Sequence, residues 1–395
     1  MKTRREDVAV ARAGAGPREH ESGEAAPATF QGIVRPDGRV GTRNHIGILT
    51  SVNCSATVAK MIASRSAALA EEFPNVDGVV ALTHGTGCGM AADGDGIRLL
   101  RRTLNGYARH PNFAALLVVG LGCEVAQLTG FDLPEGTPTM TIQGMGGTAA
   151  TVRHGVELVR ELLPEADRVE RTPVPVSELV LGLADTGTGG PANPALGAAA
   201  DLLVRHGGTA VLAGTPQVYA AEHLLTRRAA APAVAEPLAD RIHWWERHVG
   251  LPSPSEPDAP ERAVAKGGTS PLTAVHEYAE PVTGRGLVFM DTPGQVAVSA
   301  TGQIAGGATV MCVTTGGGPA DGCRPVPGLN LAATPEAYRA MAEDMDLDVS
   351  AGDAAMMGER IFRLVLEVAS GRRTAGEELG PGDEEFAPWQ IGAVM

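Results

Sequence analysis

Short apolar runs alternate with longer amphipathic stretches along most of this chain. The short runs are rich in Val, Ile and Leu, which predicts strands, and the amphipathic stretches have the spacing of helices. In the first half, the expected strands and the helices after them are His45–Val52 with Ser55–Glu72, Val76–Thr83 with Asp93–Arg109, and Ala114–Gly122 with Gly147–Leu163. A fourth, short strand is expected at Thr137–Gln143, before the last of these helices. Strands that alternate with helices predict a parallel sheet, in which all strand carboxyl ends share one edge.

The same alternation returns in the second half. Its expected strands are Glu178–Leu183, Gly208–Ala213, Gly286–Met290 and Ala308–Val313. Its expected helices are Asn193–Arg205, Pro335–Asp344 and Ala354–Ser370. The predicted fold class is therefore α/β, with two parallel-sheet domains over residues 30–172 and 173–395, and Thr172–Pro175 is typical of a linker between them. Residues 1–29 have no apolar core and predict a disordered tail, and Pro252–Lys266 predicts a mobile loop.

Three of the five cysteines follow the long strands expected in the first domain. Cys54, Cys88 and Cys123 each lie in a polar or glycine-rich turn just after a strand ends. Because parallel strands point the same way, the three thiols are expected at one sheet edge, where open α/β sheets bind ligands. Cys312, in contrast, falls inside an expected strand, as a core cysteine does. The convergence of the three thiols predicts a functional site.

Composition and charge narrow the function classes. The chain has 395 residues, of which 44% are hydrophobic and 20% charged, and its net charge is −14. With no Lys/Arg-rich tract, this acidic balance argues against nucleic acid or an anionic membrane as a partner. No run reaches the ~18 consecutive apolar residues of a membrane helix, and residues 1–29 do not resemble a secretory signal. An odd number of cysteines in a chain of this size predicts free thiols in a reducing cytoplasm.

Long motifs occur in a fixed order from about Phe30 to Met395. They are Gly32–Asn44, Asn53–Ser55, His84–Gly89, Gly120–Glu124, Ala192–Gly197, Ala221–Ala229, Phe289–Gly294, Thr301–Gly307, Asp344–Asp346 and Gly382–Gly392. In this order they resemble the altronate/galactarate dehydratase family, which also contains the large subunit of sulfolactate sulfo-lyase. The resemblance implies a dimerising α/β domain followed by a Rossmann-like catalytic domain.

The resemblance also implies an activity and partners. The activity is that of a lyase of the hydro-lyase type, which removes a leaving group β to a carboxylate with the help of a divalent metal, typically iron. A small anionic carboxylic acid is then the expected substrate. Full-length dehydratases carry a small β-clip domain before this region, so a homodimer and a separate small β-clip subunit are the expected assembly partners.

The polar side chains at the strand ends depart from the family pattern. Ala184–Thr188 stands where the family has Cys-Gly-Gly-Ser-Asp, and Gly214–Gln217 stands where it has Glu-Thr-Pro-Glu. Thr314–Pro319 replaces Thr-Thr-Gly-Arg-Gly-Ser, and the Ser-Pro-Gly-Asn-Lys stretch has no counterpart near Pro252–Lys266. We therefore expect a repurposed lyase with little or no dehydration of altronate or galactarate. The alternative hypothesis is a catalytically inactive structural or regulatory subunit.

Dehydration of a sugar acid needs a base for the α-proton, a cation for the developing enediolate and an acid for the leaving hydroxide. His84 is a candidate base or metal ligand, and Asp291, at the end of an expected strand, is the candidate carboxylate. Arg43 can bind a substrate carboxylate bidentately, with Asn44 beside it. The structural alternatives are a local hydrogen-bonding role for His84 and a capping role for Arg43 and Asn44.

A glycine-rich turn in the second domain is a candidate for anion binding. Thr315 and Gly316 begin this turn, which extends to Gly318, and its backbone amides can cradle an anion. Glycine-rich turns alone are a weak signal, and this one is no dinucleotide or P-loop fingerprint.

Cys54, Cys88, Cys123 and Glu222 are the candidate metal ligands. The three thiols can hold iron as a single ion, or as a three-cysteine iron–sulfur cluster with an open position. The single ion is favoured because no C-x-x-C spacing supports a cluster. Glu222 offers the oxygen ligands that divalent cations take. The structural alternative is that the three cysteines are small residues that fill tight turns.

Overall fold

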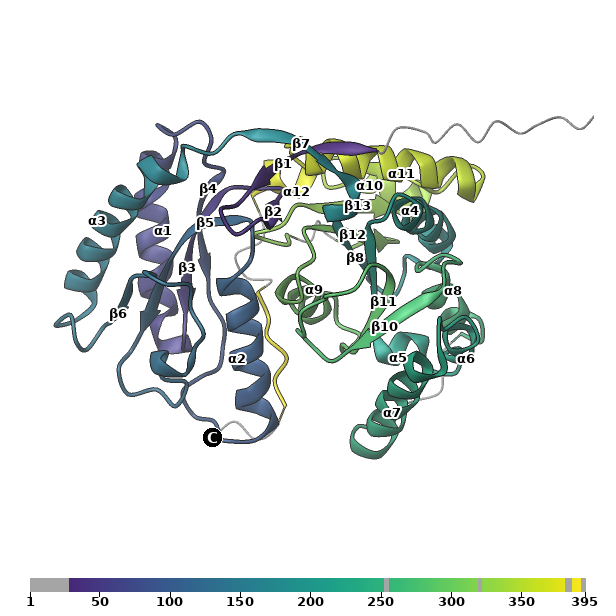
Figure 1. Ribbon diagram of the computed structural model, residues 1–395, viewed down its shortest axis with the longest axis horizontal. Helices are drawn as coiled ribbons and strands as arrows, with labels where there is room; N and C mark the ends of the chain where they lie inside the picture. Colours follow the sequence, from purple (N-terminus) through teal and green to yellow (C-terminus); the bar gives the residue numbers. More distant parts are fainter. Residues whose placement is uncertain (1–27, 252–255, 319–321, 381–385, 392–395) are drawn as a thin grey trace, which may run out of the picture.

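The computed structural model describes residues 28–251, 256–318, 322–380 and 386–391 (Figure 1). Two parallel sheets lie side by side, each covered by helices, so the predicted α/β class is confirmed. Of the predicted disordered tail, all but Ala28 and Thr29 lies outside the described residues, and Thr29 already belongs to the first strand.

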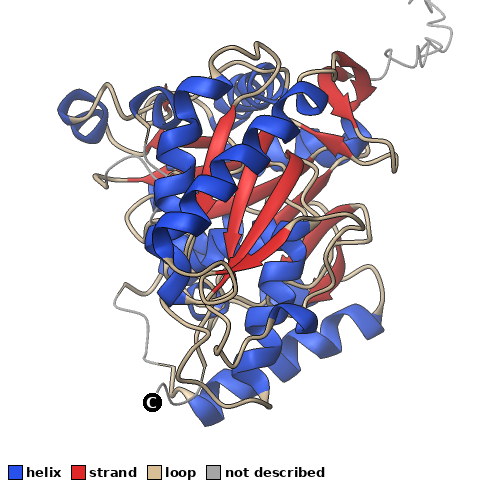
Figure 2. Cartoon of the chain, turned by 90° about the vertical axis from the view of Figure 1, so that its left-hand side faces the viewer, coloured by secondary structure: helices blue, strands red, loops and turns tan. Residues whose placement is uncertain are grey.

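Four parallel strands form the sheet of the first domain, in the order β4-β3-β5-β6. They are β3 (His45–Thr50), β4 (Gly78–Leu82), β5 (Phe113–Gly120) and β6 (Thr139–Thr141). Figure 2 shows helices lying in front of this sheet, and α1 (Ala56–Ala70) and α3 (Thr148–Ala166) share an apolar core with it. β3 is buried at all six positions because it lies in the middle of the sheet between two layers of helices.

Seven parallel strands form the sheet of the second domain, in the order β10-β11-β9-β8-β12-β13-β14. They are β8 (Val180–Asp185), β9 (Thr209–Ala213), β10 (Leu272–His276), β11 (Gly286–Met290), β12 (Val310–Thr315), β13 (Gly328–Ala332) and β14 (Leu347–Asp348). The chain leaves β8 towards β9 on one side and later adds β12 on the other. The loops after β8 and β12 therefore border the crevice in which doubly wound sheets bind ligands. The parallel sheet is confirmed, and the Rossmann-like variant stays a prediction.

A small antiparallel sheet joins the two domains, in the order β2-β1-β7. Its strands are β1 (Thr29–Val34), β2 (Val40–Gly41) and β7 (Arg171–Pro175). The expected linker Thr172–Pro175 is thus part of a strand, which pairs with β1 along its length. Pro173 and Pro175 lack an N–H donor, and they are tolerated because β7 lies at the edge of this sheet.

The helices of the second domain occupy both faces of its sheet. α4 (Asn193–Arg205) and α11 (Ala354–Ala369) pack together in one core, and α9 (Val296–Ala305) covers the other face. The remaining helices are α5 (Thr215–Val218), α6 (His223–Thr226), α7 (Pro232–His248), α8 (Ala259–Ala265), α10 (Pro335–Ala340) and α12 (Ala375–Leu379). α8 lies within the predicted mobile loop Pro252–Lys266, so that prediction is wrong for Ala259–Ala265; residues 252–255 lie outside the described residues.

The two domains share an apolar core. α2 (Asp95–Ala108) of the first domain packs against α9 of the second, and residues of both helices belong to one buried cluster. Phe386, near the end of the chain, joins this cluster with its ring 4.5 Å from that of Tyr107. The C-terminal segment therefore runs between the domains, as the yellow trace beside α2 shows (Figure 1).

Candidate active site

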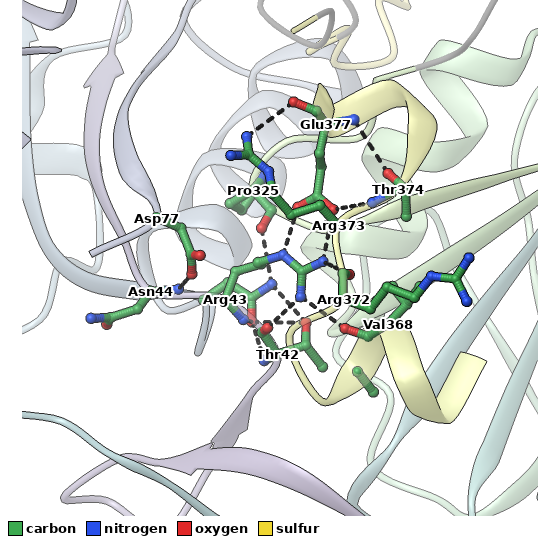
Figure 3. Close-up of polar contacts among 12 residues, drawn as sticks. Thr42, Arg43, Asn44, Asp77, Pro325, Val368, Arg372, Arg373, Thr374 and Glu377 are labelled. Atoms are coloured by element: carbon green, nitrogen blue, oxygen red, sulfur yellow. Dashed lines mark hydrogen bonds and ion pairs between the residues drawn. The ribbon is translucent and has the colours of Figure 1, made fainter. Parts of the chain in front are cut away.

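The residues just before β3 fasten the first domain to the second. Arg43 is 1% exposed and points towards α11 and α12 (Figure 3). Its Nε and Nη2 donate to the two carboxylate oxygens of Glu377, at 2.5 and 2.7 Å, and Nη1 and Nη2 also donate to the backbone oxygens of Thr42, Val368 and Arg372. These bonds use all five N–H donors of a guanidinium. No donor remains for a substrate carboxylate, so Arg43 is a structural residue here and the substrate-binding expectation is corrected.

Asn44 is fully buried, and its side-chain amide, like the guanidinium of Arg43, has protein hydrogen-bond partners. Its Nδ2 donates to the backbone oxygens of Asn75, at 2.6 Å, and Ala166, at 2.8 Å, and its Oδ1 accepts from Arg35. Asn44 lies at the amino end of β3, whereas parallel sheets bind ligands at the carboxyl ends. The expected substrate-binding role of Asn44 is therefore replaced by a structural one, and burial among its own partners is the reason.

The three cysteines lie at the opposite, carboxyl edge of the same sheet. β4 and β5 flank β3, and Cys54, Cys88 and Cys123 follow the ends of these three strands. Cys54 and Cys123 are exposed and Cys88 is half-buried. Partial desolvation raises the pKa of the Cys54 thiol, and the nearby Cys88 and Cys123 thiols raise it further, Cys88 through a hydrogen bond. The predicted convergence of the thiols at one sheet edge is confirmed.

The thiols do not form a ready metal site in this arrangement. Among the residues that the structure describes, no group of three or more His, Cys, Asp or Glu side chains is placed to hold a metal ion. Cys54 contacts the Oδ1 of Asn53 at 3.6 Å, and Cys123 accepts a hydrogen bond from Gln143 at 3.3 Å. The donor chemistry suits iron, but Cys54 and Cys123 are also hydrogen-bonded to neighbouring amide side chains.

His84 follows β4 at the same edge and is 6% exposed. Its Nε2 lies 3.0 Å from the backbone oxygen of Thr50, so Nε2 carries the proton, and its Nδ1 accepts from the backbone N–H of Thr86 at 3.3 Å. Burial lowers the pKa of His84 to about 4. His84 is therefore neutral at pH 7, and both of its ring nitrogens are engaged by the backbone.

A cavity of about 720 Å³ lies between the carboxyl ends of the two sheets. Its first-domain wall includes Asn53, next to Cys54, and His84, while Pro293 and Gln295 come from the loop after β11. The C-terminal segment supplies the rest of the lining. We call this space the inter-domain cavity; it is lined by Asn53, Ala56, Lys60, Thr83–Gly85, Pro293, Gln295, Val298 and Phe386–Gln390.

A larger cavity, of about 1140 Å³, runs along α2 on another side of the domain interface. Several of its lining residues precede strands: Pro111 comes before β5, and Glu178 and Thr309 come before β8 and β12. Arginines line it as well, but Arg102 and Arg109 are each paired with a carboxylate. Because this cavity borders the amino ends of strands, whereas the smaller inter-domain cavity borders loops that follow strands, the inter-domain cavity is the better candidate site.

Asp291 follows β11 and is 3% exposed. Its Oδ1 accepts from Thr215 Oγ1 at 2.6 Å and from Trp245 Nε1 at 2.7 Å. Burial raises the pKa of Asp291 against these two hydrogen bonds, which lower it. Asp291 lines a cavity of about 180 Å³ together with Trp389, and Trp389 also lines the inter-domain cavity. The structure therefore places Asp291 beside the candidate site, behind one aromatic side chain.

The glycine turns of the second domain are filled by this chain's own side chains. Thr315, 1% exposed, accepts at its Oγ1 from the backbone amides of Gly317 and Gly318, and the Gly316 amide donates to Thr188 Oγ1. After β8, the Asp185 carboxylate accepts from two backbone amides of its own turn, at 2.7 and 3.0 Å. In this structure the amides predicted to cradle a substrate anion already have partners.

Glu222 lies just before α6 in the second domain, and the thiols lie in the first. One carboxylate oxygen, Oε2, is buried without a hydrogen-bond partner among the described residues. No ligand group of described residues joins Glu222 to the thiols. The predicted four-residue metal set is thus split between two domains.

Sequence reasoning missed three residues, of which two line the inter-domain cavity and the third is a buried lysine. Lys60, on α1, and Trp389 line the inter-domain cavity. Lys266 is fully buried and donates to Gln217 at 2.8 Å, and burial lowers its pKa to about 8 against the raising effect of Asp185. A signal for the lysines was available: only three of the 32 basic residues are lysine, and Lys60 and Lys266 are two of these three.

The fold and the site define a two-domain α/β protein in which loops after parallel strands line a cavity between the domains. Two family profiles match the chain: "D-galactarate dehydratase/Altronate hydrolase, second domain" over residues 32–167, and "D-galactarate/Altronate dehydratase, C-terminal" over 176–253 and 262–394. The chain belongs to this galactarate/altronate dehydratase family. The gap in the second match coincides with the stretch where the sequence shows no counterpart of the family's Ser-Pro-Gly-Asn-Lys.

Characterised relatives cover most of the chain. It is 33% identical to galactarate dehydratase (L-threo-forming) of Escherichia coli, over 87% of this chain and 73% of that protein. It is 29% identical to altronate dehydratase of Bacillus subtilis, over 87% and 74%. It is also 29% identical to (2R)-sulfolactate sulfo-lyase subunit beta of Chromohalobacter salexigens, over 89% and 95%. These relatives support a lyase family. No helix of the described residues is long and apolar enough to cross a membrane.

Proposed function

We propose that this chain is a lyase of the hydro-lyase type that acts on a small hydroxylated carboxylic acid in the inter-domain cavity. The observation that carries the proposal is the place of this cavity, between the loops after β3 and β4 of the first sheet and the loop after β11 of the second. Ligand sites of parallel sheets lie at the carboxyl ends of the strands, where such loops begin. The relatives support the reaction class, since two are dehydratases and one is a sulfo-lyase subunit.

The reaction needs a base, and the chain offers two candidates. In dehydration the base removes the α-proton, the C–O bond at the β-carbon breaks, and the departing hydroxide takes up a proton from an acid and leaves as water. The resulting enol then tautomerises to a 2-keto acid. Asp291 has the freer acceptor atom, because burial raises the pKa of its carboxyl and the described residues hydrogen-bond only Oδ1, but it lines the adjoining cavity of about 180 Å³ and not the inter-domain cavity itself. His84 must first give up its bond from the Thr86 amide before its Nδ1 can accept a proton.

The proposal includes a divalent metal, with iron as the preferred ion, because the family resemblance implies one. Bound iron would stabilise the negative charge of the enediolate. Cys54 follows Asn53, which lines the inter-domain cavity, and Cys88 and Cys123 interact with Cys54, so the convergence of the three thiols supports them as the ligands. Because the described residues form no ready ligand set, the roles of Asp291 and His84 are derived without the metal. A homodimer, a small β-clip subunit and a cytoplasmic location stay predictions.

A catalytically inactive subunit is the second candidate function, and one observation favours it. Asp185 and Thr315 fill the backbone-amide turns after β8 and β12, which in a ligand-binding sheet would face the substrate. The polar groups that differ from the family pattern lie in these same turns. If the second domain no longer contacts a substrate, catalysis would be lost while the fold is kept.

One assay separates the two candidates. Protein purified without oxygen is supplied with ferrous iron and offered altronate, galactarate, sulfolactate, tartrate and glycerate, while 2-keto acids and sulfite are measured. We expect product from at least one acid, with turnover of altronate and galactarate below about 1 s⁻¹, the low end of ordinary enzymes. Asp291→Asn should then lower kcat by about 10²–10⁴-fold, the usual effect of losing a positioned base. No product from any acid, together with no bound metal, would favour the inactive subunit.

A further inference from the structure

The turns after β3 and β4, each of which carries a cysteine, are fastened to each other through their backbones. The amide of Asn53 donates to the backbone oxygen of Thr86 at 2.9 Å. Gly87 has a φ of 99°, and a Cβ atom added there would lie only 2.5 Å from the backbone oxygen of Ser51. Glycine tolerates both this φ and the close approach because it has no Cβ. The two turns are therefore in contact at the residues just before their cysteines.

Two of the three thiols meet where these turns touch. Cys54 and Cys88 share a side-chain hydrogen bond, and solvent reaches both, since Cys54 is exposed and Cys88 is half-buried. Cys123, in the turn after β5, accepts a hydrogen bond from Gln143 at 3.3 Å, and its effect on Cys54 is electrostatic. Cys54 and Cys88 are therefore the pair in direct contact.

Packing does not account for Cys54. A cysteine that serves as a small apolar residue is buried, as Cys312 is inside β12, whereas Cys54 is exposed. Thiol–disulfide exchange needs access to a sulfur and a second thiolate within reach of it, and two exposed thiols in contact meet both requirements. Cys54 also follows Asn53, which lines the inter-domain cavity, so the pair lies next to the wall of that cavity.

We propose that Cys54 and Cys88 are a redox-active pair, which a small disulfide oxidant joins in a reversible intramolecular disulfide. With oxidised glutathione, the Cys54 thiolate attacks one sulfur of the oxidant, whose S–S bond breaks as one glutathione leaves. The Cys88 thiolate then attacks the Cys54 sulfur of the mixed disulfide and releases the second glutathione. Two protein thiols are oxidised, the oxidant receives their two electrons, and the two thiol protons end on the glutathiones. Excess reduced thiol reverses both steps.

The inference does not depend on the proposed lyase function, because the disulfide forms without metal or substrate and is detected by mass. Trypsin separates the three cysteines, since Cys54, Cys88 and Cys123 fall in the peptides 44–60, 66–98 and 110–153. Protein freed of metal with a chelator is incubated with oxidised glutathione, quenched with acid, alkylated and digested. The linked pair of 44–60 and 66–98 should exceed any pair that contains 110–153 by at least about 10-fold.

The chain supplies a matched control for this preference. Cys54 and Cys88 are 34 positions apart, and Cys88 and Cys123 are 35 positions apart. The entropic cost of closing the two loops is therefore nearly equal in an unfolded chain. In urea, oxidised glutathione should form these two disulfides in similar amounts. A preference seen only in the folded protein then comes from the contact between the turns after β3 and β4.

Three variants assign the linkage. Cys123→Ser should keep the disulfide, whereas Cys54→Ser and Cys88→Ser should lose it and retain a mixed disulfide with glutathione on the remaining member of the pair. Circular dichroism checks that each variant is folded, and the wild-type ratio decides the matter even if one is not. The inference is overturned if native protein forms mainly a disulfide to Cys123, gives the same ratio as in urea, or carries glutathione without any internal disulfide.

Discussion

Polar residues flank strand β3 at both ends, but those before it are buried and those after it are exposed. Before the strand, Arg43 and Asn44 are 1% and 0% exposed, and protein groups occupy their hydrogen-bonding atoms. After it, Asn53 and Cys54 are exposed, and Asn53 lines the inter-domain cavity. An arginine near a strand therefore indicates a ligand site only where its donors remain available, and the direction of a parallel strand decides which end that is.

Two histidines repeat the comparison with nearly equal geometry. His84 follows β4 and His110 precedes β5, so they lie at opposite edges of the first sheet. In both, Nε2 lies 3.0 Å from a backbone oxygen, and Nδ1 accepts from the amide two residues later. The oxygen that His110 contacts belongs to Ala308 of the second domain. Local geometry alone thus does not distinguish a catalytic His84 from a structural histidine, and only the cavity beside it does.

The largest expected effect is on stability, at the amino end of β3. Arg43→Met leaves the Glu377 carboxylate, 17% exposed, without its cation. Burial opposes ionisation of Glu377, but Arg43 outweighs it and lowers the pKa of the carboxyl. Removing one partner of a buried ion pair costs about 3–5 kcal/mol. Urea unfolding of Arg43→Met should show a loss of this size.

The control for this prediction is Arg39→Met. Arg39 pairs with Asp37 at 2.5 Å, but both side chains are about half exposed, at 45% and 51%. A surface pair contributes about 0–1 kcal/mol. If Arg43→Met costs no more than Arg39→Met, or weakens galactarate binding while unfolding normally, then Arg43 is not the structural residue that its five bonds indicate.

The second prediction concerns acid stability and compares the two histidines. Burial lowers the pKa of both His84 and His110 to about 4, against an ordinary value of 6.5. Between pH 6.5 and 4 the unfolded chain therefore binds protons that the folded chain does not, so stability falls as the pH falls through this window. Each histidine contributes at most about 3 kcal/mol to this loss, at 1.36 kcal/mol per pKa unit.

Single substitutions of His84 and His110 separate their contributions to the loss of stability at low pH. His84→Gln and His110→Gln should each flatten the fall in stability between pH 6.5 and 4, measured by urea unfolding at several pH values. Only His84→Gln should also lower kcat, because only His84 lines the inter-domain cavity. Equal effects of the two substitutions on kcat would place His84 among the structural residues.

Much of the fold could be predicted, because the pattern of apolar positions reflects burial. β11 and α4 have the predicted bounds, and most other predicted elements differ by only a few residues at either end. The small sheet was missed because β1 gains its burial from the distant helix α11 and from pairing with β7. The two prolines in Thr172–Pro175 are typical of a linker, so the sequence pattern does not reveal that this segment pairs with β1.

The candidate site was predicted only in part, for a physical reason. The thiols were found because the alternation of strands and helices, which predicts parallel strands, can be read from short stretches of the sequence. The partners of Arg43 lie more than 300 positions away in the chain, and no local pattern reveals them. Lys60 was missed because the segment that faces it, Phe386–Gln390, reaches the inter-domain cavity from the other end of the chain.

The smallest expected effect is at the carboxyl end of β3. Cys54 and Cys123 are exposed, so Cys54→Ser and Cys123→Ser should each change the free energy of unfolding by less than about 0.5 kcal/mol. Cys312, inside β12 and fully buried, is the matched control. Cys312→Ser places a hydroxyl in an apolar core and should cost about 1–3 kcal/mol.

Alkylation of the native protein should modify Cys54 and Cys123 quickly and Cys312 only after unfolding. If Cys54→Ser instead destabilises the protein as much as Cys312→Ser does, the thiols fill tight turns and are not ligands. If stability is unchanged and bound iron falls, the carboxyl edge of the first sheet is a metal site and the contrast between the two ends of β3 is complete.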